Sequence, residues 1–142
     1  MKLNGEFRLK GGCLCGYVRY ELTLQPEGAT YCHCDDCRRT TGSAFNVGVR
    51  VRGAGLAILS GKVKAYTKTA DSGNLITREF CPECGSPLFT RSPTYPDYVF
   101  IKAGSLDDPT VVVPKDQIWT SKKVPWAQIG PSLPSFLENR TS

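Results

Sequence analysis

Alternation of apolar and polar residues is the main structural signal of this chain. It is strongest in two segments, Tyr17–Leu24 and Phe45–Val51. The apolar positions of the first are Val18, Tyr20, Leu22 and Leu24, and those of the second are Phe45, Val47, Val49 and Val51. Period-two alternation of this length is typical of strands with one buried face. Shorter strands are predicted at Val63–Tyr66, Leu75–Phe80, Leu88–Thr90 and Tyr98–Lys102, so the predicted fold class is mainly β.

Helical signal is confined to two short segments. Asp35 or Asp36 is predicted to cap a turn that carries Cys37 to Thr41, and residues 131–138 are predicted to hold one terminal turn. The chain has 142 residues and shows no internal repeat, low-complexity tract or linker. We therefore expect a single zinc-binding domain over residues 1–142, large enough to bury a core of its own.

The distribution of apolar residues also indicates where in the cell the protein is expected. Residues 1–12 contain no apolar run of the kind found in secretory signals, and no stretch approaches the roughly 18 apolar residues of a membrane helix. We therefore expect a soluble cytoplasmic protein with no membrane partner.

All seven cysteines lie in three tight clusters, which are Cys13/Cys15, Cys32/Cys34/Cys37 and Cys81/Cys84. In a reducing compartment such clusters bind metal more often than they form disulfides, and an odd number of thiols argues against a disulfide framework. Zinc takes four cysteine ligands in a closed structural site and three protein ligands in a site that keeps one position open. Seven thiols therefore predict one site of each kind.

Spacing alone leaves the partition of these thiols open. Cys34 and Cys37 could join Cys81 and Cys84 in a zinc ribbon. The pair Cys13/Cys15 could equally join Cys81 and Cys84, which would leave three ligands on one short loop as an open tripod.

The charge of the chain argues against a nucleic-acid partner. The formal net charge is +5, but seven thiolates would remove more charge than two divalent ions restore. The basic residues are also scattered and form no long tail. We therefore expect no nucleic-acid binding.

Six short motifs occur in one order along the chain: GGCLCGYVRY at residues 11–20, YCHCDDCRR at 31–39, TGSAF at 41–45, FCPECGSPL at 80–88, GSLDDP at 104–109 and IWTSK at 118–122. Together they resemble the glutathione-dependent formaldehyde-activating enzyme family, which is related to centromere protein V. The resemblance covers about residues 11–137. One departure is Gln117, where the family usually has a histidine. Glutamine cannot titrate near neutral pH as histidine does, so a proton-transfer role is not expected at this position.

The resemblance implies an Mss4-like fold of small antiparallel sheets clipped by zinc. It also implies that a structural zinc is held by Cys13, Cys15, Cys81 and Cys84. A second, catalytic zinc with an open position would be held by Cys32, Cys34 and Cys37. His33 lies between two of these ligands, and we expect it to orient or support the site rather than to bind the ion.

The implied reaction is that of a carbon–sulfur lyase or synthase. A thiol that coordinates zinc becomes a thiolate, which could attack formaldehyde or a related aldehyde to give an S-hydroxymethyl adduct. The expected thiol is glutathione. The alternative is a zinc-stabilised binding module without turnover, since fold alone does not decide function.

Several residues are predicted to contact the thiol. Arg38 and Arg39 would bind its carboxylates, although a solvent-facing role is also open for both. Hydroxyl and backbone donors would come from Thr41, Gly42 and Ser43, which could instead simply form a turn. Trp119 and Lys122 would wall the pocket, although a core position is favoured for Trp119.

Overall fold

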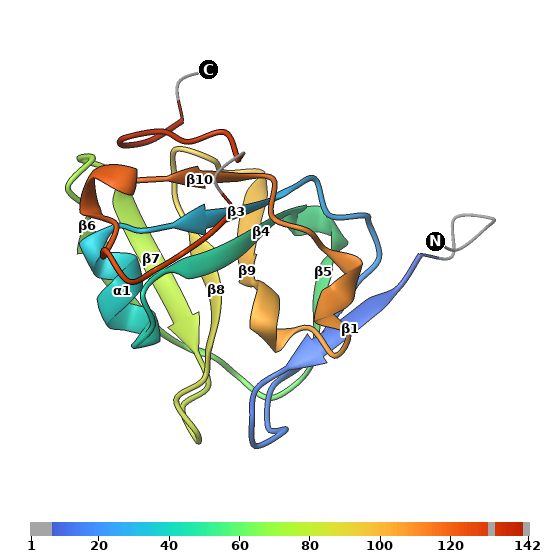
Figure 1. The fold of residues 1–142 in the computed structure, drawn as a ribbon. Helices are drawn as coiled ribbons and strands as arrows, with labels where there is room; N and C mark the ends of the chain where they lie inside the picture. The colour runs from blue at the N-terminus through green and yellow to red at the C-terminus, as the bar shows by residue number, and fades with distance from the viewer. Residues whose placement is uncertain (1–6, 131–132, 141–142) are drawn as a thin grey trace.

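The computed structural model describes residues 7–130 and 133–140, which form two β-sheets and a short helix (Figure 1). The smaller sheet has the order β1 (Leu9–Gly12), β2 (Arg19–Leu22), β5 (Leu56–Ser60). The larger sheet has seven strands in the order β10 (Asp116–Ile118), β3 (Ala29–Cys32), β4 (Asn46–Arg52), β9 (Tyr98–Lys102), β8 (Pro87–Arg91), β7 (Leu75–Phe80), β6 (Lys64–Thr69). The β10–β3 pair is parallel, and the other named pairs are antiparallel.

The hydrophobic core joins the two sheets. Tyr20 of β2 packs edge-on against Phe89 of β8, with ring centroids 5.2 Å apart. The same buried cluster contains Val18, Leu22, Val49, Val51, Leu88, Val99 and Ile101. Val49 and Val51 are buried in β4 as the alternation predicts, and Val47 is half-buried beside them. Leu24, in contrast, lies beyond the end of β2 and is 44% exposed, so its predicted burial is wrong.

The predicted strands agree with the structure to different degrees. β7 and β9 have the predicted bounds, and the other predicted strands are shifted or resized by a few residues. Four short strands, β1, β3, β5 and β10, were not predicted. They have three to five residues each and depend on pairing with neighbours, which local periodicity does not reveal.

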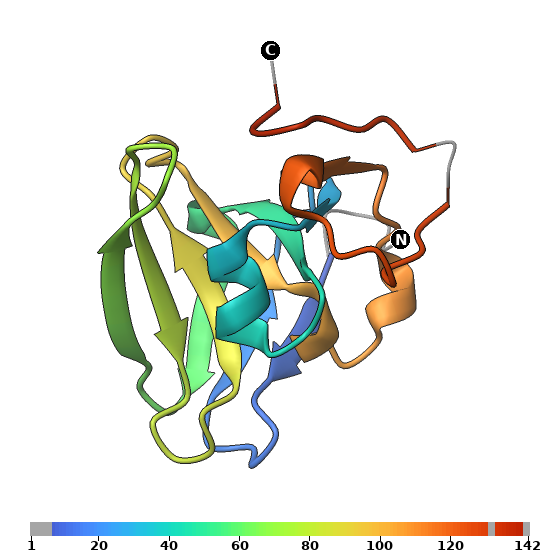
Figure 2. The ribbon, with the colours of Figure 1, turned by 60° about the vertical axis from the view of Figure 1, so that its left-hand side comes forward.

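Helix α1 (Asp35–Thr41) lies in front of the seven-stranded sheet, between the β6–β7 hairpin and the C-terminal segment (Figure 2). Its N-cap is Cys34, whose Sγ accepts a hydrogen bond from the backbone N–H of Cys37. The predicted caps, Asp35 and Asp36, are instead the first helical residues. The helix thus begins earlier than predicted because a thiol accepts the bond that a carboxylate was expected to accept.

The predicted terminal turn is also corrected. Residues 131–132 lie outside the described residues, and residues 133–138 run beside β10 without helical structure. Ser135 forms a parallel bridge with Gln117, and backbone hydrogen bonds join Phe136 and Glu138 to the chain at residues 117–120. The segment is therefore held by pairing with β10 rather than by a turn of its own. Within the described ranges, no helix is both long and apolar enough to span a membrane.

Candidate metal centres and active site

Four thiols meet where the β1–β2 loop approaches the turn after β7. The Sγ atoms of Cys13, Cys15, Cys81 and Cys84 all lie within 4.8 Å of one another. The Sγ atoms of Cys13 and Cys15 are 3.6 Å apart, and those of Cys15 and Cys81 are 3.8 Å apart. Tetrahedral zinc with Zn–S bonds of about 2.3 Å places its sulfurs roughly 3.8 Å apart. The four-thiol cluster therefore fits a zinc ion without rearrangement.

The backbone around the four-thiol cluster is shaped to hold it. Gly16 and Gly85 have φ angles of 83° and 80°, which close the turns that follow Cys13 and Cys81. The backbone N–H of Val18 donates to Sγ of Cys13 at 3.2 Å, and such donors stabilise a thiolate. The four thiols of this cluster could supply all the ligands of one tetrahedral ion.

The other three thiols lie at the junction of β3 and α1. Cys32 is the last residue of β3, Cys34 is the N-cap of α1, and Cys37 lies in its first turn. Their Sγ atoms also lie within 4.8 Å of one another. Hydrogen bonds from Cys32 and then Cys37 lower the pKa of Cys34 to about 2, while the pKa of Cys32 is raised chiefly by Cys34. The pKa of Cys37 is also raised, to about 11, so one thiolate, on Cys34, is favoured without metal, and a divalent ion would have to displace the other protons.

The three-thiol cluster opens into a cavity of about 520 Å³, whereas the four-thiol cluster does not. The floor of the cavity is one face of the seven-stranded sheet, opposite the hydrophobic core. Alternate residues of the strands line it: Thr30 and Cys32 of β3, Asn46, Gly48 and Arg50 of β4, Tyr98, Phe100 and Lys102 of β9, Thr90 of β8, Ile76 and Arg78 of β7, and Asp116 and Ile118 of β10. The same alternation that builds the core therefore builds the cavity.

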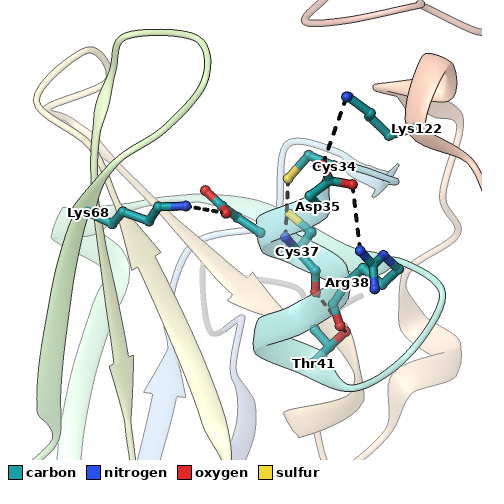
Figure 3. Close-up of polar contacts among 8 residues, drawn as sticks. Cys34, Asp35, Cys37, Arg38, Thr41, Lys68 and Lys122 are labelled. Atoms are coloured by element: carbon teal, nitrogen blue, oxygen red, sulfur yellow. Dashed lines mark hydrogen bonds and ion pairs between the residues drawn. The ribbon is translucent and has the colours of Figure 1, made fainter.

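Acidic residues at the cavity are mostly neutralised by ion pairs. Asp35 lies 3.7 Å from Arg38 and 3.9 Å from Lys122, and Asp36 accepts a hydrogen bond from Lys68 at 2.6 Å (Figure 3). Asp116 pairs with Arg140, and Glu27 pairs with Arg52.

Four basic residues of the cavity have no ion-pair partner among the described residues, and they are Arg50, Arg78, Lys102 and Lys115. The unpaired charge of the cavity is thus mainly positive, which favours an anionic ligand.

Lys102 is the most buried of these cations, with 8% of its surface exposed. Its Nζ donates to Oδ1 of Asn46 at 2.7 Å, and Asn46 is paired with Cys32 across β3 and β4. Burial lowers the pKa of Lys102, and the negative charge of Cys37 opposes that effect. Lys102 therefore lies at the end of the cavity that holds the three-thiol cluster.

The predicted contact residues divide into two groups. Trp119 and Lys122 line the cavity, and Trp119 is half-buried there rather than in the core. Its indole Nε1 donates to Asn139, which the core prediction did not anticipate.

The second group lies outside the lining and consists of Arg38, Arg39, Thr41, Gly42 and Ser43. These residues lie in the later part of α1 and just beyond its C-terminal end, whereas its N-terminal end faces the cavity. Arg38 pairs with Asp35, and the Thr41 hydroxyl donates to the backbone oxygen of Cys37. Gly42 is the left-handed C-cap. These five residues therefore lie outside the cavity lining, and their contacts with a thiol stay a prediction.

His33 and Gln117 lie on the side of β3 and β10 away from the cavity. Both are buried, with 0% and 5% of their surfaces exposed, and neither lines the cavity. His33 also packs edge-on against Phe45, with ring centroids 5.8 Å apart. Position 117 therefore lies outside the cavity lining.

Sequence reasoning did not find the cations on the cavity floor. Arg50, Arg78 and Lys102 lie on the cavity-facing side of β4, β7 and β9. For Arg50 and Lys102 the available signal was a position out of phase with the valines and isoleucine of the same strand, whereas Arg78 is in phase with Ile76 and Phe80 and gave no such signal. Which of several such faces converge on one cavity follows from the strand order, which local patterns do not give.

Comparisons with known proteins agree with this geometry. A family model described as glutathione-dependent formaldehyde-activating enzyme matches residues 8–122. A Halomonas elongata protein named "Putative glutathione-dependent formaldehyde-activating enzyme" is 27% identical over 127 residues, which is 85% of this chain and 80% of that protein. A crystal structure of a Rhodobacter sphaeroides protein aligns with a TM-score of 0.58 and 19% identity, over 89% of this chain and 98% of that one. The two sheets and two cysteine clusters are consistent with the Mss4-like fold that the motifs implied.

Proposed function

The chain belongs to the glutathione-dependent formaldehyde-activating enzyme family, and from this premise we propose that it is a zinc-dependent carbon–sulfur lyase. Its substrate would be the adduct of a small thiol, glutathione, with formaldehyde or a related aldehyde. In the direction of synthesis the sulfur bonds to the carbonyl carbon, the carbonyl oxygen becomes a hydroxyl, and the thiol proton ends on that oxygen. Cleavage is the reverse.

The two cysteine clusters have different roles in this proposal. Cys13, Cys15, Cys81 and Cys84 would hold a zinc that ties the β1–β2 loop to the turn after β7. Cys32, Cys34 and Cys37 would hold a second zinc, which when bound lowers the pKa of an incoming thiol so that it reacts as a thiolate.

The cavity residues would bind and orient the substrate. Lys102 and Arg78 offer N–H donors to anionic groups near the three-thiol cluster, and Asn46 holds the ammonium group of Lys102 in place. Trp119 and Lys122 lie in the cavity wall, where they would limit the access of water.

One observation carries the proposal: the cluster of three thiols opens into a cation-lined cavity, whereas the cluster of four does not. A purely structural zinc site gains nothing from an open fourth position in a cavity of about 520 Å³. The alternative is a binding module that binds a thiol without turnover, and measuring turnover distinguishes the two.

The direct test is exchange of ¹³C-formaldehyde with glutathione, followed by NMR in the presence of the zinc-loaded protein. We expect the protein to raise the rate at which the S-hydroxymethyl adduct forms and reverts, without changing its equilibrium amount. The Cys34→Ser variant serves as the matched control. Equal exchange rates with the wild type, the variant and no protein would reject the lyase and favour the binding module.

A further inference from the structure

The cavity floor is elongated along the strands β3, β4 and β9. Cys32 and Asn46 pair across β3 and β4 at one end, where the three-thiol cluster lies. Arg50 lies four residues further along β4 and also lines the cavity. At about 3.3 Å per residue, the two ends of the floor are roughly 13 Å apart. A ligand that contacts both ends must therefore be elongated.

The guanidinium group of Arg50 makes few hydrogen bonds within the protein. Its Nη2 donates to the backbone oxygen of Glu27 at 3.3 Å, whereas its Nε is buried and has no hydrogen-bond partner among the described residues. Because this Nε is buried, the donors left for a ligand in the cavity are the other N–H groups of the guanidinium. The carboxylate of Asp116 attracts Arg50 through space, but its hydrogen bonds among the described residues go to Arg140 and Thr30.

The guanidinium group of Arg50 is also held in one place. Its carbon lies 5.4 Å from the ring centroid of Tyr98, which is a cation–π contact. The Tyr98 hydroxyl in turn donates to Glu27 at 2.9 Å, which fixes the ring. An arginine fixed in this way against an aromatic ring retains its planar fork for a carboxylate.

We propose that Arg50, positioned by Tyr98, is a second anchor for the substrate that binds an anionic group far from the thiol. The inference rests on the proposed function and narrows its substrate class. The thiol would be carried on an extended, peptide-like chain with an anionic group on the order of 10 Å from the sulfur, which is the full reach of an extended arm and not of a single α-amino acid. Short anionic thiols such as cysteine would not reach Arg50 from the three-thiol cluster.

Arg52 provides a matched control on the same strand. Its guanidinium carbon lies 5.0 Å from the same Tyr98 ring, but the side chain is about half exposed, at 51%, and bonded to Glu27. It does not line the cavity. Replacing Arg52 removes the same charge and a similar aromatic contact without removing a donor from the cavity.

The test is calorimetric titration of glutathione and of cysteine into zinc-loaded wild type, Arg50→Met and Arg52→Met. Metal content and thermal melting verify that each variant is folded. For Arg50→Met, we expect glutathione affinity to fall about ten-fold or more, because a charge-assisted hydrogen bond is lost. Cysteine affinity should change less than two-fold, as should both affinities in Arg52→Met. If Arg50→Met loses metal, Arg50→Lys replaces it, with an expected several-fold loss for glutathione alone.

The remaining outcomes separate the two proposals. Unchanged glutathione affinity in the Arg50 variant would overturn the second anchor and leave the proposed function intact. An equal loss for cysteine, or in Arg52→Met, would also overturn it, because the effect would then be one of general charge. If the wild type binds neither thiol, the proposed function itself fails, and this inference fails with it.

Discussion

His33 donates a hydrogen bond from Nε2 to Oε1 of Gln117, at 2.9 Å in the protein interior. The neighbouring bonds fix this direction. Ser135 uses its hydroxyl proton on the backbone oxygen of Leu133, so it accepts from Nε2 of Gln117, which leaves Oε1 facing His33. His33 therefore carries a proton on Nε2, and burial lowers its pKa.

The first prediction concerns this buried bond. Gln117→Ala should lower the free energy of unfolding by about 1–3 kcal/mol, because it leaves a donor of His33 unpaired in the interior. Glutathione affinity should stay within two-fold, since the side chain lies outside the cavity lining. Denaturant unfolding and thiol titration of the same preparation check both parts. A large loss of affinity with unchanged stability would give position 117 a functional role that this geometry does not support.

The second prediction concerns the four-thiol cluster. Cys81→Ala should bind one metal ion fewer and melt at least about 10 °C lower, because the remaining thiols no longer tie the two loops together. Metal analysis and calorimetric melting measure these effects. Chelation of the wild type should produce a similar loss of stability. Full metal content and an unchanged melting temperature in the variant would contradict the assignment.

The third prediction concerns Lys102, the buried cation beside Asn46. Lys102→Met should weaken glutathione binding by about ten-fold, because it removes a charged donor near the three-thiol cluster. Lys115→Met is the matched control, since Lys115 also lines the cavity but is exposed. Titration of both variants decides the point. Equal effects at the two positions would indicate a diffuse charge effect rather than a contact with Lys102.

The fourth prediction concerns acid sensitivity. Partial burial acts to raise the pKa of Asp116, but hydrogen bonds from Arg140 and Thr30 outweigh it, and the pKa is lowered overall. A carboxylate with a lowered pKa stabilises the fold above its unfolded pKa, and this stabilisation is lost as pH falls through the folded value. Asp116→Asn should therefore be less stable than wild type by about 1 kcal/mol or less at pH 7.

The difference between Asp116→Asn and wild type should shrink as pH falls from about 5 to 3, when followed by unfolding at several pH values. Arg140→Ala should reduce the same pH dependence, because Arg140 supplies the principal hydrogen bonds to Asp116. A stability difference that stays constant down to pH 3 would rule out this linkage.

The sequence predicted the parts of the fold that depend on local pattern. The alternation around Val49 and Val51 correctly predicted a strand with a buried face, because burial acts on every second residue. The bounds of β7 and β9 were also correct. Short strands such as β10 were missed because three residues carry no periodicity, and their pairing depends on distant segments.

The cysteine clusters were predictable, because the spacing of the cysteines along the sequence determines which thiols lie together. Thiols one or two residues apart must lie together, and the motifs implied the four-and-three grouping that the structure has. The arginines next to Cys37 were expected to bind the substrate because they are close in sequence. Neither Arg38 nor Arg39 lines the cavity, because the N-terminal end of α1 faces it, so their contact with a substrate stays a prediction. Arg50 and Lys102 line the cavity because β4 and β9 are neighbours in the sheet.

The central claim is that the three-thiol cluster holds a zinc that binds a thiol. The most direct measurement is calorimetry of glutathione against protein of known metal content, at several pH values and with Cys34→Ser as the control. The account predicts two zinc ions per chain and an affinity that rises with pH until the free thiol ionises, because binding as a thiolate releases a proton. Cys34→Ser should stay folded, keep one zinc ion and lose binding. Absence of binding at millimolar glutathione, a pH-independent affinity, or unimpaired binding by Cys34→Ser would contradict the claim.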